Sequence, residues 1–281
     1  MDLDGLDAVQ FAALDAVQLA ALDARLAELG SVAVAFSGGV DSSVLAHAAH
    51  RVLGSAAVAV VADSASLPRR ELEEARQVAK AIGIRLVELA TDEQDDPDYQ
   101  ANRGDRCYFC KAALFRALDA WRSSEGIPWA ALGEIADDAL DDRPGRRAAQ
   151  EAGVVAPLAE AGFTKEQVRA YAHAFALPVA DKPAMACLAS RIPVGTRVSR
   201  ELLGTVERAE DGLRDLGLRV VRVRHRGAHA SVELGAADLA EVERDERPAR
   251  QAVLGAGFHT VSFSHYLSPA ERAARATADP A

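Results

Sequence analysis

The stretch Val32-Ala33-Val34-Ala35-Phe36-Ser37-Gly38-Gly39-Val40-Asp41-Ser42-Ser43 decides the expected fold of this 281-residue chain. Its apolar beginning has the length of a buried strand, and the Val44-Leu45-Ala46 segment that follows favours a helix. The stretch therefore predicts a strand, a glycine turn and a helix N-terminus. Backbone N–H groups are unpaired at such a terminus and the helix dipole is positive there, so we expect an anion-binding site.

The residue types of the turn indicate which anion it would bind. Gly38 and Gly39 let the main chain approach a phosphate without an intervening Cβ. Asp41 could hold Mg²⁺, which prefers few carboxylates together with phosphate oxygens. The turn lacks the Gly-Lys-Ser/Thr of a Walker loop and the third glycine of a dinucleotide fingerprint.

Ser-Gly-Gly-Val-Asp-Ser instead resembles the PP-loop of ATP pyrophosphatases, and the alternative is an ordinary glycine turn in an α/β domain. The resemblance implies that ATP is bound by Ser37, Gly38, Gly39, Val40, Asp41 and Ser42.

Composition limits the class of protein. Apolar residues make up 49% and charged residues 26%, which is typical of a globular chain, and the length favours two domains. No apolar run approaches the roughly 18 residues that span a membrane, and the N-terminus lacks the pattern of a secretory signal, so we expect a cytoplasmic protein. The net charge of −10 argues against tRNA or DNA as a partner.

Strand and helix patterns alternate through the first two thirds of the chain and predict a parallel α/β sheet. Strands are expected at 32–36, 57–62, 84–89 and 129–132, and helices at 8–30, 69–82, 111–121 and after Thr164. A surface loop is expected at 91–103 and a turn at Pro144-Gly145.

Polar residues follow two of the expected strands, at the edge where open α/β sheets bind ligands. Asp63 and Ser64 follow the second strand, where we expect contact with adenosine, although they could equally form a helix N-cap region. Gly133 and Glu134 follow the fourth strand, where we expect the nucleotide and a second magnesium ligand.

The three cysteines are Cys107, Cys110 and Cys187, and an odd number argues against a disulfide framework. Cys107 and Cys110 could share a metal or cluster, or be a chance pair or half of a redox dithiol. Lys182 and Arg191 would favour a thiolate at Cys187. Beside an ATP-cleaving loop, these thiols indicate sulfur attack on an adenylated carboxylate. Three thiolates could hold a 4Fe-4S cluster whose fourth iron takes exogenous sulfide, or Cys187 alone could be the nucleophile.

The pattern changes near residue 198 to a small α+β unit, with helices at 200–216 and 237–253 and strands at 219–226, 230–234 and 258–264. We therefore expect an ATP-binding domain at 1–198, a substrate-binding or oligomerisation domain at 199–267 and a tail at 268–281. Arg222, Arg224 and Arg226 share one strand face, which could bind phosphate or be a solvated face paired with Glu233.

Five segments together resemble the LarE family: residues 37–43, 106–111, 143–145, 156–160 and 182–195, with 186–193 the most specific. The resemblance implies a cytoplasmic ATP-dependent sulfur transferase of nickel-pincer cofactor biosynthesis. It would adenylate a carboxyl of pyridinium-3,5-biscarboxylic acid mononucleotide, release pyrophosphate and make a thiocarboxylate. Cys187, Asp41 and Arg191 would be catalytic, and Arg222 and Arg224 would bind the substrate phosphate.

The resemblance also separates two branches of that family. In one, the cysteine matching Cys187 gives up its own sulfur and becomes dehydroalanine. In the other, three cysteines bind a 4Fe-4S cluster, and this chain resembles that branch through Cys107, Cys110 and Cys187. Family members form hexamers, so a homo-oligomer is expected. Ile135 stands where the family often has asparagine.

Three other functions remain open at this point. A PP-loop tRNA thiolase would also combine the loop with Cys-x-x-Cys and one further cysteine, but the acidic composition argues against it. An amide-forming PP-loop synthetase would leave the cysteines unexplained, and an ATP sensor would bind without turnover. The sequence does not identify the sulfide donor.

Overall fold

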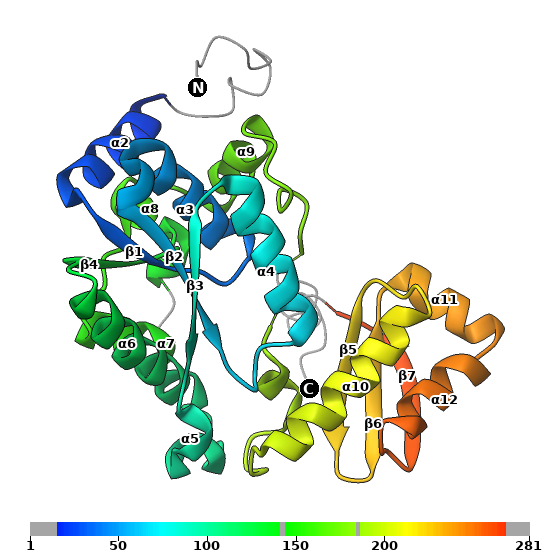
Figure 1. Ribbon diagram of the computed structural model, residues 1–281. Coiled ribbons are helices and arrows are strands. Elements are labelled where there is room, and N and C mark those ends of the chain that lie inside the picture. The colour runs from blue at the N-terminus through cyan, green and yellow to red at the C-terminus, as the bar shows by residue number, and fades with distance from the viewer. Residues whose placement is uncertain (1–15, 141–143, 184–185, 268–281) are drawn as a thin grey trace. The chain divides into compact units, whose positions relative to one another are not determined.

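The computed structural model describes residues 16–140, 144–183 and 186–267 (Figure 1). By its internal contacts the chain forms two compact units, residues 1–99 with 104–186, and residues 100–103 with 187–281. This division falls before the boundary expected near residue 198. The functional roles expected of the two domains stay predictions, and the expected tail at 268–281 lies outside the described residues.

The first unit is built on a four-stranded sheet in the order β3-β2-β1-β4. Its strands are β1 (Val32–Ala35), β2 (Ala57–Asp63), β3 (Arg85–Ala90) and β4 (Trp129–Leu132). Every neighbouring pair is parallel, which confirms the predicted parallel α/β fold. The strands therefore end at one edge, and β1, between β2 and β4, lies at the point where the strand order reverses.

Helices cover both faces of this sheet (Figure 1). Val32 and Val34 of β1 share a buried cluster with residues of α2 (Ala16–Leu29), α3 (Val40–Leu53), α4 (Arg69–Ile82) and α9 (Lys165–Ala174). Ala33 and Ala35, which point the other way, join residues of α6 (Arg106–Ser124) and α7 (Pro144–Glu151). A strand covered on both faces needs apolar residues throughout, which is why β1 reads as a continuous apolar run.

Shorter elements connect these layers. They are η2 (Gly54–Ala56), η3 (Glu93–Asp95), α5 (Pro97–Ala101), η4 (Ala136–Leu140) and α8 (Pro157–Glu160). The prediction of a surface loop at 91–103 was wrong, because η3 and α5 form there and bury Glu93, Gln94, Tyr99 and Asn102. The turn predicted at Pro144-Gly145 is instead the start of α7, where proline lacks only an N–H that would be unpaired anyway.

The second unit contains the sheet β5-β6-β7. Its elements are η5 (Leu188–Arg191), α10 (Arg200–Asp215), β5 (Val221–Arg226), β6 (His229–Leu234), α11 (Ala236–Arg244), α12 (Arg247–Gly255) and β7 (Thr260–His265). β5 and β6 are antiparallel, whereas β6 and β7 are parallel. The single helix predicted at 237–253 is two helices, because the chain breaks at Asp245-Glu246 and Pro248 is tolerated only in the first turn of the next helix, which begins at Arg247.

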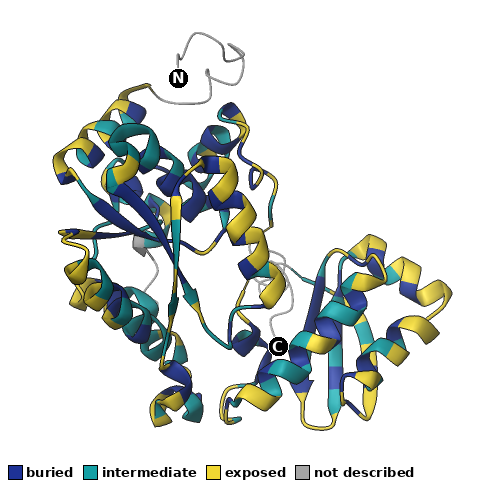
Figure 2. Ribbon diagram, viewed as in Figure 1, coloured by how far each residue is buried: buried dark blue, intermediate teal, exposed yellow. Residues whose placement is uncertain are grey.

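The two faces of the second sheet differ in burial (Figure 2). Val221 and Val223 of β5 are fully buried, as are Ala230, Val232 and Leu234 of β6. The intervening residues of β6, His229, Ser231 and Glu233, are polar and only partly buried. The apolar face makes the core of this unit, and the polar face carries Arg222 and Arg224 of β5.

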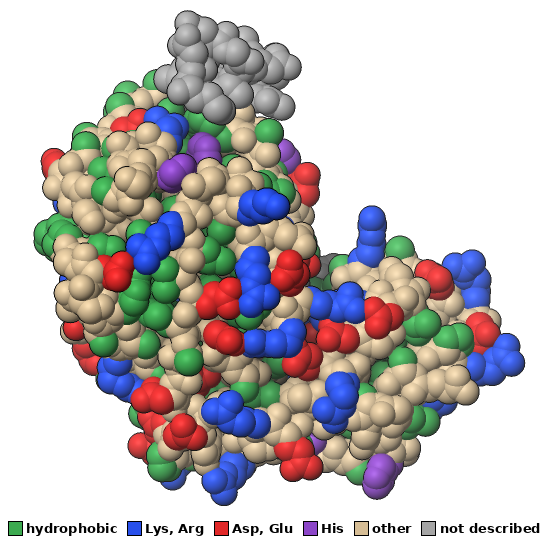
Figure 3. Space-filling model, viewed as in Figure 1, with side chains coloured by type: hydrophobic (Ala, Val, Ile, Leu, Met, Phe, Trp, Pro, Cys, Tyr) green, Lys and Arg blue, Asp and Glu red, His purple; other side chains and the backbone are tan. Residues whose placement is uncertain are grey.

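Charged side chains of both signs alternate on the face of the molecule in Figure 3. On α4, for example, Arg76 lies 2.7 Å from Glu88 of β3 and 3.1 Å from Glu73. Such exposed pairs each contribute about 0–1 kcal/mol to stability. In the ranges that the structure describes, none of the helices combines the length and the apolar character needed to cross a membrane.

Candidate active site

The β1–α3 connection has the geometry of an anion site. Gly38 adopts a left-handed backbone with φ of 68°, which glycine tolerates without strain. Gly39 is the N-cap residue of α3, and no side chain caps the helix there. The first N–H groups of a 14-residue helix therefore face outward at the carboxyl edge of the sheet.

Two serine hydroxyls hold this loop in shape. Ser42 Oγ accepts the N–H of Ser37 at 3.2 Å, donates to the carbonyl of Gly39 at 3.2 Å, and lies 3.0 Å from Ser37 Oγ. Ser43 Oγ is buried and has no hydrogen-bond partner among the described residues. A buried hydroxyl without a partner is destabilising.

Gly133 is brought against the same turn. A Cβ at Gly133 would lie 2.8 Å from the backbone nitrogen of Ser42 and 2.9 Å from the carbonyl carbon of Asp41. The end of β4 therefore packs directly on the N-terminus of α3, and only glycine fits. The adjacent Glu134 lies 2.8 Å from Arg146. Contact between these two residues and a nucleotide stays a prediction.

Asp41 is paired with a lysine that the sequence did not single out as functional. Lys165 Nζ donates to both Asp41 carboxylate oxygens, at 2.6 and 2.8 Å. The backbone of Lys165 is fixed because its N–H donates to Asp137 and because Thr164 caps α9. The sequence showed only the capping box at this helix start. The partner of Lys165 lies 124 residues away, so no local pattern pointed to it.

Asp63 and Ser64 lie where predicted, at the end of β2, but both contact Arg69. The Arg69 guanidinium pairs with the Asp63 carboxylate and donates to the carbonyl of Ser64 at 2.6 Å. The alternative interpretation was a helix N-cap region before α4 (Arg69–Ile82); the N-cap residue there is Pro68, and no side chain caps the helix. The predicted contact with adenosine stays a prediction.

Cys107 and Cys110 are the second and fifth residues of α6, which begins several residues earlier than predicted. Cys107 is exposed and Cys110 is partly buried. Between them, Tyr108 donates to Glu151 of α7 at 2.6 Å, and the Arg147 guanidinium lies 4.4 Å from the Tyr108 ring centre. The cysteine turn is thereby fixed to α7.

Lys111 follows the two cysteines on α6. Burial lowers the pKa of the Lys111 ammonium, against the opposing effect of Cys110, Cys107 and Glu134. Gly145 of α7 packs beside it, since a Cβ there would lie 3.2 Å from Lys111 Cγ and 3.5 Å from the carbonyl oxygen of Cys107.

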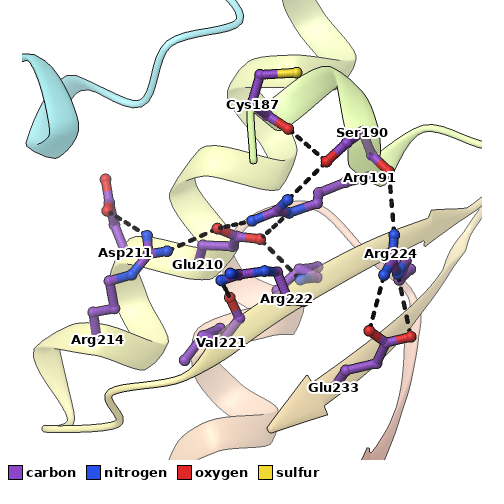
Figure 4. Close-up of polar contacts among 11 residues, drawn as sticks. Cys187, Ser190, Arg191, Glu210, Asp211, Arg214, Val221, Arg222, Arg224 and Glu233 are labelled. Carbon is purple, nitrogen blue, oxygen red and sulfur yellow. Dashed lines mark hydrogen bonds and ion pairs between the residues drawn. The ribbon is translucent and has the colours of Figure 1, made fainter. Parts of the chain in front are cut away.

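Cys187 belongs to the second unit and is exposed, immediately before η5. Its carbonyl accepts the N–H of Ser190 at 3.0 Å and the hydroxyl of Ser190 at 2.7 Å. Arg191 donates from Nη1 to that same Ser190 hydroxyl at 2.8 Å. Figure 4 shows the Cys187 sulfur pointing away from Arg191. Arg191 therefore contacts the backbone of the Cys187 loop through Ser190, rather than the thiol as predicted.

The Arg191 guanidinium is buried against Glu210 of α10. Arg191 Nε lies 2.7 Å from Glu210 Oε1, with 1% and 0% of the two side chains exposed. Glu210 also accepts from Arg214 at 2.9 Å and from the N–H of Val223 at 3.0 Å (Figure 4). The carboxylate is thus saturated with donors, as a buried charge requires.

Arg222 and Arg224 lie on one face of β5, as predicted. Arg224 pairs with Glu233 at 3.0 Å, the pairing that the sequence left open as an alternative to phosphate binding, and donates to the carbonyl of Ser190 at 3.2 Å. Arg222 is buried, donates to the carbonyl of Val221 at 2.9 Å and stacks on Tyr266. Burial and the nearby Arg191 lower the pKa of Arg222. Phosphate binding by these arginines stays a prediction.

The cysteines are divided between the two units. Cys107 and Cys110 lie in the first and Cys187 lies in the second. In the described parts of the chain, no three His, Cys, Asp or Glu side chains come together as a metal site. A cluster shared by the three cysteines stays a prediction.

Comparison with known proteins identifies the family. The asparagine synthase family model matches residues 13–103, which contain the β1–α3 loop. An uncharacterised protein of Synechocystis sp. is 42% identical over 218 residues, covering 78% of this chain and 81% of that protein. The pyridinium-3,5-bisthiocarboxylic acid mononucleotide synthase of Lactiplantibacillus plantarum is 35% identical over 217 residues, covering 77% and 79%.

A more distant relative shares a shorter segment. The glutamine-hydrolysing GMP synthase of Chlamydia muridarum is 27% identical over 125 residues, which is 42% of this chain and 23% of that protein. The Synechocystis and Lactiplantibacillus plantarum relatives combine at least 35% identity with alignment over more than three quarters of both chains, so they are the informative ones. Together with the loop geometry, they confirm the resemblance drawn from the motifs: the chain belongs to the LarE family of PP-loop enzymes, the ATP-using sulfurtransferases.

Proposed function

We propose that this enzyme converts a carboxylate of pyridinium-3,5-biscarboxylic acid mononucleotide to a thiocarboxylate, with ATP cleaved to AMP and pyrophosphate. The Lactiplantibacillus plantarum relative is named as a synthase of the corresponding bisthiocarboxylic acid. The observation that carries the proposal is the glycine loop at an uncapped helix N-terminus, with Asp41 beside it. These features suit the first half-reaction, carboxylate adenylation.

In adenylation, a substrate carboxylate oxygen attacks the α-phosphorus of ATP. The bond to the β-phosphate bridging oxygen breaks, so pyrophosphate leaves and an acyl-adenylate forms. Residues 37–42 would hold the departing pyrophosphate with backbone N–H groups, which stabilise its growing charge. Asp41 would hold Mg²⁺, which, when bound, would neutralise part of the phosphate charge.

Lys165 would change partners during nucleotide binding. Its ammonium occupies the Asp41 carboxylate, and the two side chains are 39% and 31% exposed. A cation that replaced it on Asp41 would release Lys165 toward phosphate oxygens without a large desolvation change. Lys165 would thus neutralise Asp41 before nucleotide binds and neutralise the phosphates afterwards.

In the second half-reaction, sulfur attacks the adenylated carbon and the bond to AMP breaks. If Cys187 gives its own sulfur, its thiolate forms a thioester, and loss of the Cα proton with cleavage of the Cβ–Sγ bond leaves dehydroalanine. If Cys107, Cys110 and Cys187 hold a 4Fe-4S cluster, that group would supply bound sulfide as the nucleophile. The two exposed thiols and the partly buried one are accessible for either role.

We assign the substrate phosphate to Arg222 and Arg224. Arg224 is partly exposed and its bond to Glu233 could be exchanged for a phosphate, to which a guanidinium binds in a bidentate manner. Homo-oligomerisation into a hexamer, a cytoplasmic location and the absence of nucleic acid from the reaction also stay predictions. Light scattering on the purified protein checks the first.

The test uses the whole chain, purified without oxygen and incubated with ATP, Mg²⁺, sulfide and the pyridinium dicarboxylate. Pyrophosphate, AMP and thiocarboxylate should appear in equal amounts. Pyrophosphate without sulfur in the product would favour an amide-forming synthetase, and no pyrophosphate would favour an ATP sensor. Sulfur incorporation into tRNA would identify a thiolase instead.

The source of sulfur needs a separate measurement of iron, acid-labile sulfide and protein mass. About four irons per chain, lost on substitution of any of the three cysteines, would support the cluster. No iron, together with loss of the mass of hydrogen sulfide at Cys187 after one turnover, would mean that Cys187 is consumed.

A further inference from the structure

We propose that Lys182 is a positioning residue of the phosphate loop, which holds the carbonyl of the Gly38–Gly39 peptide and so keeps this oxygen from turning toward the phosphates. The proposal rests on the proposed function in one respect, that this loop binds the phosphates of ATP. It is carried by contacts within the first unit: the packing of Gly38 on α4 and the position of the Lys182 ammonium.

Gly38 lies directly on helix α4. A Cβ at Gly38 would be 2.9 Å from Cβ and 3.0 Å from Cα of Ala75, which is fully buried. With φ at +68°, the Gly38 backbone adopts a conformation that side chains disfavour. Helix α4 therefore acts as a rigid support behind the loop, and any larger residue at Gly38 would push the loop away from it.

Lys182 contacts the same helix, α4. Its ammonium lies 2.7 Å from Glu71 Oε2, 2.8 Å from Glu74 Oε2 and 3.3 Å from the carbonyl oxygen of Gly38. Glu71 and Ala75 are four residues apart on α4, so the residue that holds Lys182 and the residue that touches Gly38 share one helix face. One helix thus controls both the position of Gly38 and the direction of its carbonyl.

The ammonium is held firmly in this place. Only 13% of the Lys182 side chain and 12% of the Glu71 side chain are exposed. Burial disfavours the charged form, but the hydrogen bonds that the ammonium donates to Glu71 and Glu74 outweigh this effect and raise the pKa of Lys182 above its usual value. The group therefore remains a cation at every pH at which the protein would work, so its attraction for the carbonyl is permanent.

The direction of this peptide matters because Gly38 and Gly39 both lack a Cβ. A peptide between two glycines reorients more easily than any other, since no side chain blocks either rotation. In the observed orientation its carbonyl accepts from Lys182 at 3.3 Å and its N–H donates to Ser37 Oγ at 3.3 Å. The reverse orientation would aim a carbonyl dipole at the phosphates, where a donor is needed.

A purely structural role for Lys182 is a distinct alternative. In that case its ion pairs with Glu71 and Glu74 would only fasten the segment near residue 182 to α4. Loss of Lys182 would then lower the melting temperature and weaken all nucleotides alike. A positioning role predicts a loss confined to ligands that carry the pyrophosphate group, because that is the group at the loop.

The test compares the full-length wild type with Lys182→Met, Lys182→Arg and Lys80→Met by calorimetric titration with ATP, pyrophosphate and AMP in the presence of Mg²⁺. Lys80 is an exposed lysine of α4, so Lys80→Met is the same chemical change away from the loop. Lys182→Met should weaken ATP and pyrophosphate about 10- to 100-fold, the effect of one charge-assisted hydrogen bond. AMP affinity should be unchanged, Lys182→Arg should recover most of the loss, and Lys80→Met should match the wild type.

Unchanged affinity for ATP in Lys182→Met, or an equal loss for AMP, would overturn the proposal. If Lys182→Met does not fold, Glu71→Gln is the deciding variant, because it weakens the ion pair that holds Lys182. It should lower the affinity for ATP and pyrophosphate by a smaller factor and leave the affinity for AMP unchanged. Any other result overturns the proposal. A wild type that binds neither ATP nor pyrophosphate would instead refute the proposed function.

Discussion

The two units each contain an acidic side chain paired with a cation close to a residue of proposed catalytic importance, but the pairs differ in burial. Asp41 and Lys165 of the first unit are 31% and 39% exposed, whereas Glu210 and Arg191 of the second are 0% and 1% exposed. An exposed pair is worth about 0–1 kcal/mol and is easily exchanged, whereas breaking a buried pair costs about 3–5 kcal/mol. The Asp41–Lys165 pair at the phosphate loop can therefore exchange partners, whereas the Arg191–Glu210 pair is a permanent support of the Cys187 loop.

The largest effect on activity should come from removing the Cys187 thiol. Cys187→Ala should abolish thiocarboxylate formation and leave pyrophosphate release with ATP and the dicarboxylate largely intact, because the thiol belongs to the second half-reaction. Mass spectrometry of the product and a pyrophosphate assay measure the two halves separately. Loss of ATP binding in this variant would refute the role assigned to Cys187.

Breaking the buried Arg191–Glu210 pair should lower the free energy of unfolding more than breaking the exposed Asp41–Lys165 pair. Arg191→Met leaves Glu210 buried with one cation fewer, so unfolding of the second unit in urea should lose about 3–5 kcal/mol. Lys165→Met, which breaks the exposed pair, should lose about 1 kcal/mol or less from the first unit. Equal losses of unfolding free energy in Arg191→Met and Lys165→Met would contradict the distinction between a buried and an exchangeable pair.

Exchange at the phosphate loop is tested at Asp41. Asp41→Asn keeps the shape of the side chain but removes the charge expected to hold Mg²⁺, so pyrophosphate release should fall about 100-fold with little change in melting temperature. Titration of Mg²⁺ at fixed ATP measures the accompanying loss of metal affinity. A variant that needs no more Mg²⁺ than the wild type would place the metal elsewhere.

A further effect, on the pH dependence of stability, arises at His47 of the first unit. His47 lies 2.8 Å from the hydroxyl of Tyr171, and burial, with smaller contributions from Arg51 and His50, lowers its pKa from 6.5 to about 4. In the unfolded chain His47 binds a proton below about pH 6.5, whereas in the folded chain it binds that proton only near pH 4. Stability is therefore complete above pH 6.5 and falls as the pH is lowered toward 4, by up to about 3 kcal/mol.

Urea unfolding from pH 7 to pH 4 measures this dependence. His47→Gln, which can still bond to Tyr171, should flatten the pH profile between 6.5 and 4. His173→Gln is the matched substitution at a more exposed histidine, whose side chain is 46% exposed. A profile that does not respond to His47→Gln would show that another group titrates.

The fold could be predicted because its signals are local. The apolar run before Ser37 and the glycines after it predict a strand, a loop and a helix within a dozen residues, and the four parallel strands formed as expected. The errors have physical causes. The acidic segment at 91–103 reads as a surface loop, but Tyr99 and Glu93 are buried within it. The helix predicted at 237–253 disregarded Pro248, a local signal that the sequence did contain.

The missed parts of the candidate sites are contacts between residues far apart in the chain. Lys165 meets Asp41 across 124 residues and Lys182 meets the carbonyl of Gly38 across 144. No periodicity or motif spacing encodes such pairs, since they exist only after the sheet and α4 are assembled. The arginine face of β5 was predicted from its alternation, whereas the burial of Arg222 follows from packing that the alternation does not describe.

The most direct test of the central claim is a single-turnover reaction of the anaerobically purified wild type with ATP, Mg²⁺, sulfide and the pyridinium dicarboxylate mononucleotide. Pyrophosphate and thiocarboxylate are quantified in the same sample. The account predicts one pyrophosphate released for each thiocarboxylate formed, with the sulfur absent from the product of Cys187→Ala. Thiocarboxylate formed without pyrophosphate, or formed equally well by Cys187→Ala, would contradict it.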